Sequence, residues 1–541
     1  MINRRKLLHF SAFGAAAALG GCSVLRSLTP TDFDFPVIDI HGHIFNGTDI
    51  PVQGYLEQVF LRDPHSEIEP PGLVGSLLRL LVFIFREATP DAKQELNALR
   101  SPTQGDFAPA VAGRSDAGDS AAVARALANF RANLANRDAA PSLDGSNPDQ
   151  ELLDLLAGPS DEIPDFAPSI GAPADFPTAQ RIYEREPGQK TYVRNSRIFQ
   201  TIRWAGLLTR PRSRILDEYV SLYKETGQVS VLSPSILDFE LWFRADDKVS
   251  PMSDQVEVMS EIARRNNELL VLNFLQFCPL RAALQRRQGR NPLQLLEHAV
   301  KRRGFAGVKL YPPLGYKPIG NAADASFGEK PGKKVRGAQI DRELNALFDW
   351  CVRNDVPIKS HATNSNDAGV CTAQNASPAL WAPVLKARPE LRLNLAHFGR
   401  FDESVETSKC SGGPTDWEEL TAQMLDSDPG LHTDLGYWVK AYDGPFSNRS
   451  RIRNRLRQLV RDYPTLEDRL MFGTDWSILA REPTHPDYIG QIEGVVQTVG
   501  LDARRVFHDN AVGFLGLMPG TQQWARLSAF FGEDRLRNSL T

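Results

Sequence analysis

A regular alternation of helix-like and strand-like segments runs over residues 212–499, and it constrains the fold more than any other feature of this chain. Segments with helical spacing, such as 253–267, alternate with short apolar runs, such as 305–311 and 391–397. Nearly all-apolar strands separated by helices of roughly 10 to 15 residues are typical of a parallel sheet covered by helices. Counting the earlier apolar run 37–44 as the first strand gives eight strands.

We therefore predict an α/β fold, a closed (β/α)8 TIM barrel whose active site lies at the carboxyl ends of the strands. The alternative is an open, doubly wound sheet, which would bind its ligand at a topological switch point. The barrel would comprise residues 35–47 and 212–518. Residues 48–211 interrupt the alternation and are predicted to form a large insertion of helices and loops after the first strand. Residues 519–541 would form a short helical appendage.

Within the insertion, two stretches rich in Gly, Ala, Pro, Ser and Asp, 101–120 and 139–178, are expected to be loops. An amphipathic helix is predicted between them, over 121–136. The strongly apolar segment 73–85 is too short to span a bilayer, which takes about 20 residues. We predict that this segment packs over the barrel mouth as a lid, with a position on the membrane surface as the alternative.

Histidine and aspartate side chains stand at the ends of four predicted strands. His41 and His43 lie in the first strand, and later strands end in His361, His397 and Asp475. Side chains at positions i and i+2 of a strand point the same way, so His41 and His43 can both reach one metal ion. A single histidine at a strand end is more often a core or rim residue, but this ordered set favours a metal site.

Three imidazoles, from His41, His43 and His361, and the carboxylate of Asp475 form a ligand set that suits Zn²⁺ or a similar divalent ion. Such an ion with an open position lowers the pKa of its bound water from about 16 to about 7, so that hydroxide becomes the expected nucleophile. His397 would orient this water or polarise the substrate carbonyl. Asp475 would accept the proton of the water while it touches the metal.

The motifs around these residues resemble the amidohydrolase superfamily, in particular its branch of hydrolases and decarboxylases similar to aminocarboxymuconate semialdehyde decarboxylase. The resemblance covers 35–47 and about 213–518. It implies that His41, His43, His361 and Asp475 are metal ligands and that His397 is the catalytic base or polarising residue. The matching motifs are Asp39-Ile-His41-Gly-His43, Gly307-Val-Lys-Leu-Tyr311, Ser360-His361, Ala396-His397-Phe-Gly399, Gly473-Thr-Asp475-Trp476 and the closing segment from His508 to Gly516.

The resemblance also bears on the number of metal ions, because binuclear members carry a carboxylated lysine at the end of strand four, where Lys309 lies. The Gly-Val-Lys-Leu-Tyr pattern looks like the mononuclear branch, so we expect one ion, Zn²⁺, with Mn²⁺ or another divalent ion as the alternative. Lys309 would then meet a substrate carboxylate or lie exposed at the rim. Arg400 and Trp476 are further candidates for substrate contact; the alternatives are an exposed arginine and a packed tryptophan.

The first 22 residues read as an export signal. Arg4 and Arg5 form a twin-arginine pair, a short alanine-rich apolar core follows, and Gly20-Gly21-Cys22 closes the segment. This ending resembles a bacterial lipoprotein cleavage site with Cys22 as the lipid-bearing residue. We expect an exported protein, anchored through this lipid to the bacterial cell envelope, on the periplasmic side of a membrane in a Gram-negative cell. A plain cleaved signal peptide is the alternative.

The balance of 62 basic against 66 acidic residues is nearly neutral and gives no reason to expect nucleic acid as a partner. We predict a metal-dependent hydrolase that attacks the amide, ester or lactone carbonyl of a small molecule, including carboxylate-bearing substrates. One alternative is nonoxidative decarboxylation of an unsaturated or aromatic carboxylic acid at the same metal site. Another is a surface lipoprotein that uses the barrel as a non-catalytic binding module.

Overall fold

The computed structural model describes most of the predicted barrel and parts of the insertion. The signal segment with Cys22, the predicted loops 101–120 and 139–178, and Arg400 lie outside the described residues, and the predicted helix 121–136 is described only in part. The described residues are 31–58, 71–100, 125–126, 128–130, 132, 201, 203–243, 248–286, 291–324, 326–328, 334–363, 368–369, 371–399, 401 and 416–541.

The strands form one parallel sheet in the order β1-β2-β4-β5-β6-β7-β8-β9, with β3 also paired to β2. β3 and β4 follow one another along the chain and both pair with β2, so they occupy one strand position and the sheet has eight such positions. A parallel bridge between Gly42 and Trp476 joins the two edges of the sheet. The predicted (β/α)8 barrel is therefore confirmed. The strands are β1 (Val37–Gly42), β2 (Val229–Ile236), β3 (Leu270–Val271), β4 (Phe274–Gln276), β5 (Gly307–Leu310), β6 (Ile358–His361), β7 (Leu393–Ala396), β8 (Leu431–Asp434) and β9 (Leu470–Met471).

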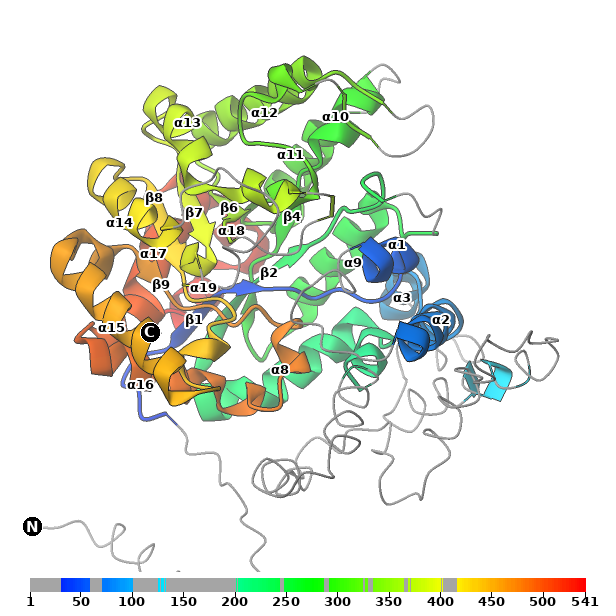
Figure 1. Ribbon diagram of the computed structural model, residues 1–541, viewed down its shortest axis with the longest axis horizontal. Helices are drawn as coiled ribbons and strands as arrows, with labels where there is room; N and C mark the ends of the chain where they lie inside the picture. The colour runs from blue at the N-terminus through cyan, green and yellow to red at the C-terminus, as the bar shows by residue number, and fades with distance from the viewer. Residues whose placement is uncertain are drawn as a thin grey trace, which may run out of the picture.

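Helices surround the sheet, as Figure 1 shows. Their inward faces follow the helical period: in α12 the buried residues Ile340, Leu344, Leu347 and Cys351 recur at spacings of three and four. The helices around the barrel are α8 (Arg212–Gly227), α9 (Met252–Arg265), α10 (Pro279–Gln285), α11 (Pro292–Arg302), α12 (Gly337–Arg353), α13 (Ala382–Ala387), α14 (Trp417–Ser427), α15 (Phe446–Asp462), α16 (Tyr488–Val499) and α17 (Asn510–Leu515).

The amino-terminal end of the barrel is covered by the C-terminal helices α18 (Gln522–Phe531) and α19 (Glu533–Asn538). Trp524, Leu527 and Leu536 from these helices belong to one buried cluster with Ile38 of β1 and Phe274 of β4. Burial of this apolar surface stabilises the closed end of the barrel. The C-terminal appendage is thus packed against the strands rather than detached from them.

Three helices of the insertion, α1 (Val52–Gln58), α2 (Pro71–Ala88) and α3 (Ala92–Arg100), lie together on one side of the barrel next to α9 (Figure 1). Leu80, Ile84 and Phe85 of α2 are buried in the main hydrophobic core. This part of the predicted lid therefore packs on the protein. Among the described residues, no helix has the length and apolarity needed to cross a membrane.

A buried ion-pair cluster joins the insertion to the barrel. Arg212, at the start of α8, pairs with Asp49 at 2.5 Å and with Glu95 of α3 at 2.7 Å, and all three side chains are at most 1% exposed. The Ser213 backbone N–H also donates to Glu95 at 2.9 Å. We call Arg212, Asp49 and Glu95 the anchoring cluster; it fixes α3 and the segment after β1 to one helix of the barrel.

Candidate active site

Asp39 holds β1 in position beneath the site. This buried carboxylate accepts hydrogen bonds from the Thr474 hydroxyl at 2.6 Å, the Tyr219 hydroxyl at 2.8 Å and the His41 backbone N–H at 3.1 Å. Burial raises the pKa of Asp39 to about 6, although the hydrogen bonds from Thr474 and Tyr219 act in the opposite direction. The contact with Thr474 ties β1 to the segment after β9, which brings His41 and Asp475 together.

Asp475 does not lie in a strand, because β9 ends at Met471 and residues 472–475 have no regular secondary structure. Asp475 has a left-handed backbone (φ 62°), and its N–H donates to the His41 carbonyl at 2.6 Å. Its Oδ1 lies 3.5 Å from His41 Nε2 and 3.3 Å from His43 Nε2. The ligand atoms of these three residues all lie within 4.8 Å of one another.

The side chains of His41 and His43 present unprotonated Nε2 atoms to the carboxylate of Asp475. His43 Nδ1 donates to the Ser235 carbonyl at 3.1 Å, and His41 Nδ1 donates to the Asp434 carboxylate at 3.2 Å. Burial lowers the pKa of His41 to about 3 and also lowers the pKa of His43. Both rings are therefore neutral, with a lone pair on Nε2 directed toward Asp475. This donor set fits a divalent metal ion.

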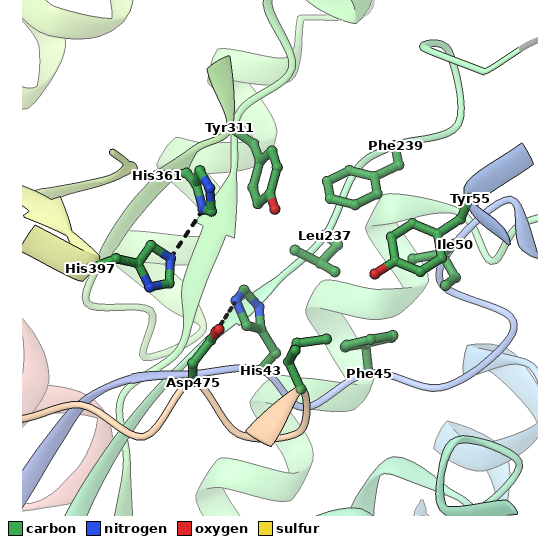
Figure 2. A pocket seen from close by; sticks show the side chains of 11 residues that line it. His43, Phe45, Ile50, Tyr55, Leu237, Phe239, Tyr311, His361, His397 and Asp475 are labelled. Atoms are coloured by element: carbon green, nitrogen blue, oxygen red, sulfur yellow. Dashed lines mark hydrogen bonds and ion pairs between the residues drawn. The ribbon is translucent and has the colours of Figure 1, made fainter. Parts of the chain in front are cut away.

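His361 ends β6 and His397 follows β7, so both lie at the carboxyl end of the barrel, as Figure 2 shows. His397 Nδ1 donates to the Gly436 carbonyl at 3.0 Å, and His397 Nε2 lies 3.1 Å from His361 Nδ1. Burial lowers the pKa of His397. The structure thus places His361 next to His397. His361 lies outside the group of ligand atoms formed by His41, His43 and Asp475.

Asp434, at the end of β8, is a member of the site that the sequence did not reveal. Its carboxylate accepts hydrogen bonds from His41 Nδ1, from Asn394 at 2.6 Å, and from the backbone N–H groups of His397 at 3.0 Å and Gly436 at 2.9 Å. Burial acts to raise the pKa of Asp434, but the hydrogen bonds from His41 and Asn394 hold it below its ordinary value. Asp434 therefore fixes the orientation of His41 and the backbone of His397.

Two buried lysines lie side by side inside the barrel, because Lys309 of β5 and Lys359 of β6 are in register. Lys309 Nζ lies 3.1 Å from His41 Nε2, and burial lowers the pKa of Lys309 to about 8. Lys359, which the sequence did not single out, donates to the carbonyls of Ile40 at 2.9 Å and Ser233 at 2.7 Å. Lys309 thus contacts a candidate metal ligand and is absent from the pocket lining described below.

Trp476 is fully buried and packs edge-on against Tyr219 and Tyr223. It lies in the core rather than in the pocket wall. The pocket beside the candidate metal site has a cavity volume of about 40 Å³. Its described lining residues are His43, Phe45, Ile50, Tyr55, Leu237, Phe239, Tyr311, His361, His397, Asp475 and Ile478.

Similar solved structures were found at low sequence identity. An uncharacterised TIM-barrel protein from Bordetella bronchiseptica is 15% identical, over 57% of this chain and 83% of that one, with a TM-score of 0.34. A zinc-bound amidohydrolase from Burkholderia multivorans is 13% identical, over 58% and 91%, with a TM-score of 0.36. A manganese complex of 5-carboxyvanillate decarboxylase from Novosphingobium aromaticivorans is 10% identical, over 56% and 83%, with a TM-score of 0.34.

A comparison with functionally curated proteins gives no significant match. Residues 243–517 match the family model described as Amidohydrolase. The matched segment includes three of the strand-end residues described above, His361, His397 and Asp475. It spans 275 of the 541 residues, which is more than half of the sequence. The chain therefore belongs to the amidohydrolase family.

Proposed function

We propose that this protein is a metal-dependent hydrolase that cleaves the amide, ester or lactone bond of a small molecule. It would bind one divalent ion, for which Zn²⁺ is the favoured candidate, through His41, His43, His361 and Asp475. The single observation that carries the proposal is the convergence of two unprotonated imidazole nitrogens and one carboxylate oxygen within 4.8 Å, next to a pocket. Such nitrogen and oxygen sets suit Zn²⁺ and related ions.

A divalent ion at this site would supply hydroxide at neutral pH, because coordination lowers the pKa of water from about 16 to about 7. The protein's side chains would accept the proton of the water and orient the water for attack. Although burial acts to raise it, the pKa of Asp475 lies below its ordinary value, so the carboxylate is ionised at neutral pH and offers oxygens that can hold a metal ion and accept a proton from water. His397 donates through Nδ1 to a carbonyl, and its Nε2 accepts from His361 Nδ1 at 3.1 Å, so His397 would orient the ligand His361; its further proposed role is to orient the attacking water.

The test is metal analysis of the full chain together with a turnover screen of esters, lactones, amides and unsaturated or aromatic carboxylic acids. We expect about one divalent ion per chain, and hydrolysis that is lost on chelation and restored by metal. His43→Ala should abolish metal binding and hydrolysis, whereas His298→Ala, at a histidine outside the site, should change neither the metal content nor the turnover. CO₂ release without hydrolysis would support the decarboxylase instead. Metal binding without turnover would support a non-catalytic binding module. Two ions per chain, with a carboxylated Lys309, would support a binuclear site.

We also propose that the protein is exported and lipid-anchored through Cys22. Cys371 is disulfide-bonded, whereas Cys278 and Cys351 are buried free thiols. Disulfides persist mainly in oxidising compartments, so the bond at Cys371 supports export. Cys22→Ala should release the protein from the membrane fraction. Membrane association that is unchanged in this variant would rule out the lipid anchor.

A further inference from the structure

A row of aromatic rings extends from the candidate metal site to the insertion (Figure 2). Tyr311 stacks on His361 with ring centroids 4.6 Å apart, and Phe239 meets Tyr311 at 5.1 Å. Tyr55 of α1 then lies nearly parallel to Phe239, with centroids 6.3 Å apart and an interplanar angle of 24°. We call Tyr55, Phe239 and Tyr311 the aromatic wall. It gives the pocket one continuous aromatic side, in which Tyr55 lies nearly parallel to Phe239 and Tyr311 meets Phe239 edge-on at 63°.

The rest of the pocket beyond the histidines and Asp475 is apolar. Its other described lining residues are Phe45, Ile50, Leu237 and Ile478, and no lysine or arginine is among the described residues of the lining. A charged substituent packed against these apolar side chains would lose its hydration, which is costly. The described pocket therefore suits an uncharged, flat group beside the reacting carbonyl. Offset or edge-on ring contacts favour such a group by more than its buried area alone.

Tyr55 is held in place by contacts on both sides of its helix. Val52 and Leu56 of α1 are buried in the main core. In the preceding segment, the Asn46 amide donates to the carbonyls of Pro90 and Arg210, at 3.1 and 3.3 Å, and Asp49 belongs to the anchoring cluster. Because these polar groups are buried and paired, the segment that carries Tyr55 forms a fixed part of the pocket.

Tyr55 lies outside the segment that matches the family model. The segment that matches the amidohydrolase family begins at residue 243, whereas Tyr55 comes from the insertion after β1. We propose that Tyr55 is a specificity-determining residue through which the insertion selects substrates with a neutral aryl or similarly flat acyl group. This inference rests on the proposed function, because it assumes that a carbonyl compound enters this pocket.

The experiment measures the binding of benzamide, cyclohexanecarboxamide and acetamide to the metal-loaded full chain by isothermal titration calorimetry. Benzamide and cyclohexanecarboxamide differ in flatness at nearly equal size, so we expect benzamide to bind more tightly. Tyr55→Leu keeps an apolar side chain but removes the ring, and should lower the affinity for benzamide roughly tenfold. Tyr55→Phe should retain the preference. Phe446→Ala, at a side chain that is 77% exposed, is the control.

Two results would overturn the proposal: equal affinity for benzamide and cyclohexanecarboxamide, or a preference for benzamide that Tyr55→Leu leaves intact. Unfolding curves of both Tyr55 variants establish that they fold. Adding phenyl benzoate to the same preparations tests the hydrolase proposal separately from the proposed role of Tyr55. Selective binding of benzamide without hydrolysis of this ester would support the role of Tyr55 and count against the proposed hydrolase alone.

Discussion

The two carboxylates that contact the ring of His41 have different tasks. Asp475 lines the pocket, where it can reach a ligand and water. Asp434 is fully buried, and its oxygens are taken up by His41, Asn394 and two backbone N–H groups. A carboxylate on the far nitrogen of a metal-binding imidazole fixes the tautomer and makes the ring a stronger ligand. Asp434 is therefore a positioning residue for His41.

Asp434→Asn should weaken metal binding without removing any predicted ligand. The amide has no negative charge to hold the Nδ1 proton of His41, so we expect a loss of roughly 10- to 100-fold in metal affinity. Equilibrium dialysis against a competing chelator, followed by metal analysis, measures this loss. Asp426→Asn, at an exposed residue of α14, is the matched control. Equal metal affinity in the two variants would show that Asp434 does not act through His41.

At the residue scale, strand ends were the informative signal. His41, His43, His361, His397 and Asp475 could be expected to converge because each follows an apolar run. Asp434 also ends a strand, β8, but it is not among the strand-end residues predicted from the sequence. Lys359 offered no signal, because its partners, the carbonyls of Ile40 and Ser233, come from strands that are remote in the sequence.

At the scale of elements, the insertion is attached to the barrel by charge as well as by apolar packing. Arg212 lies between two buried carboxylates, those of Asp49 and Glu95. Removing one partner from such a group leaves the remaining charges buried without compensation. Each barrel element could be predicted from its hydrophobic period, but these long-range pairs could not, because the three residues lie in three separate segments of the chain.

Arg212→Met should destabilise the protein by about 3 to 5 kcal/mol, since it leaves Asp49 and Glu95 buried without their cation. Denaturant unfolding followed by circular dichroism measures the free energy of unfolding. Lys301→Ala, on α11, removes an exposed pair with Glu297, whose side chains are 43% and 46% exposed, and should cost at most about 1 kcal/mol. Similar losses in the two variants would mean that the anchoring cluster contributes no more than a surface ion pair.

At the scale of the whole molecule, closing the barrel buries histidines that lie outside the candidate site. His432 of β8 is 5% exposed and His485, in the segment before α16, is 8% exposed. Burial, assisted by the charge of Arg469, lowers the pKa of His432 to about 3. Burial and the charge of Arg203 lower the pKa of His485 to about 4, although its hydrogen bond to the Glu482 carbonyl opposes the shift. Both side chains are neutral in the folded protein at neutral pH.

These histidines should make the protein less stable as the pH falls. Below pH 6.5 the unfolded chain binds protons at His432 and His485, whereas the folded chain does not bind one at His485 until about pH 4. The unfolded state thus binds more protons, and the free energy of unfolding decreases between pH 6.5 and 4. For His485 alone, the difference in pKa corresponds to about 3 kcal/mol.

His485→Gln should reduce this dependence on pH. Glutamine can still donate to the Glu482 carbonyl but does not titrate, so the loss of stability between pH 7 and pH 4 should shrink by up to about 3 kcal/mol. Denaturant unfolding at the two pH values, for the variant and the unsubstituted protein, measures this difference. His298→Gln, at a side chain that is 42% exposed, controls for the loss of a histidine. If His485→Gln loses as much stability on acidification as the unsubstituted protein, the burial of His485 does not contribute to acid unfolding, and the destabilising protons must bind elsewhere in the chain.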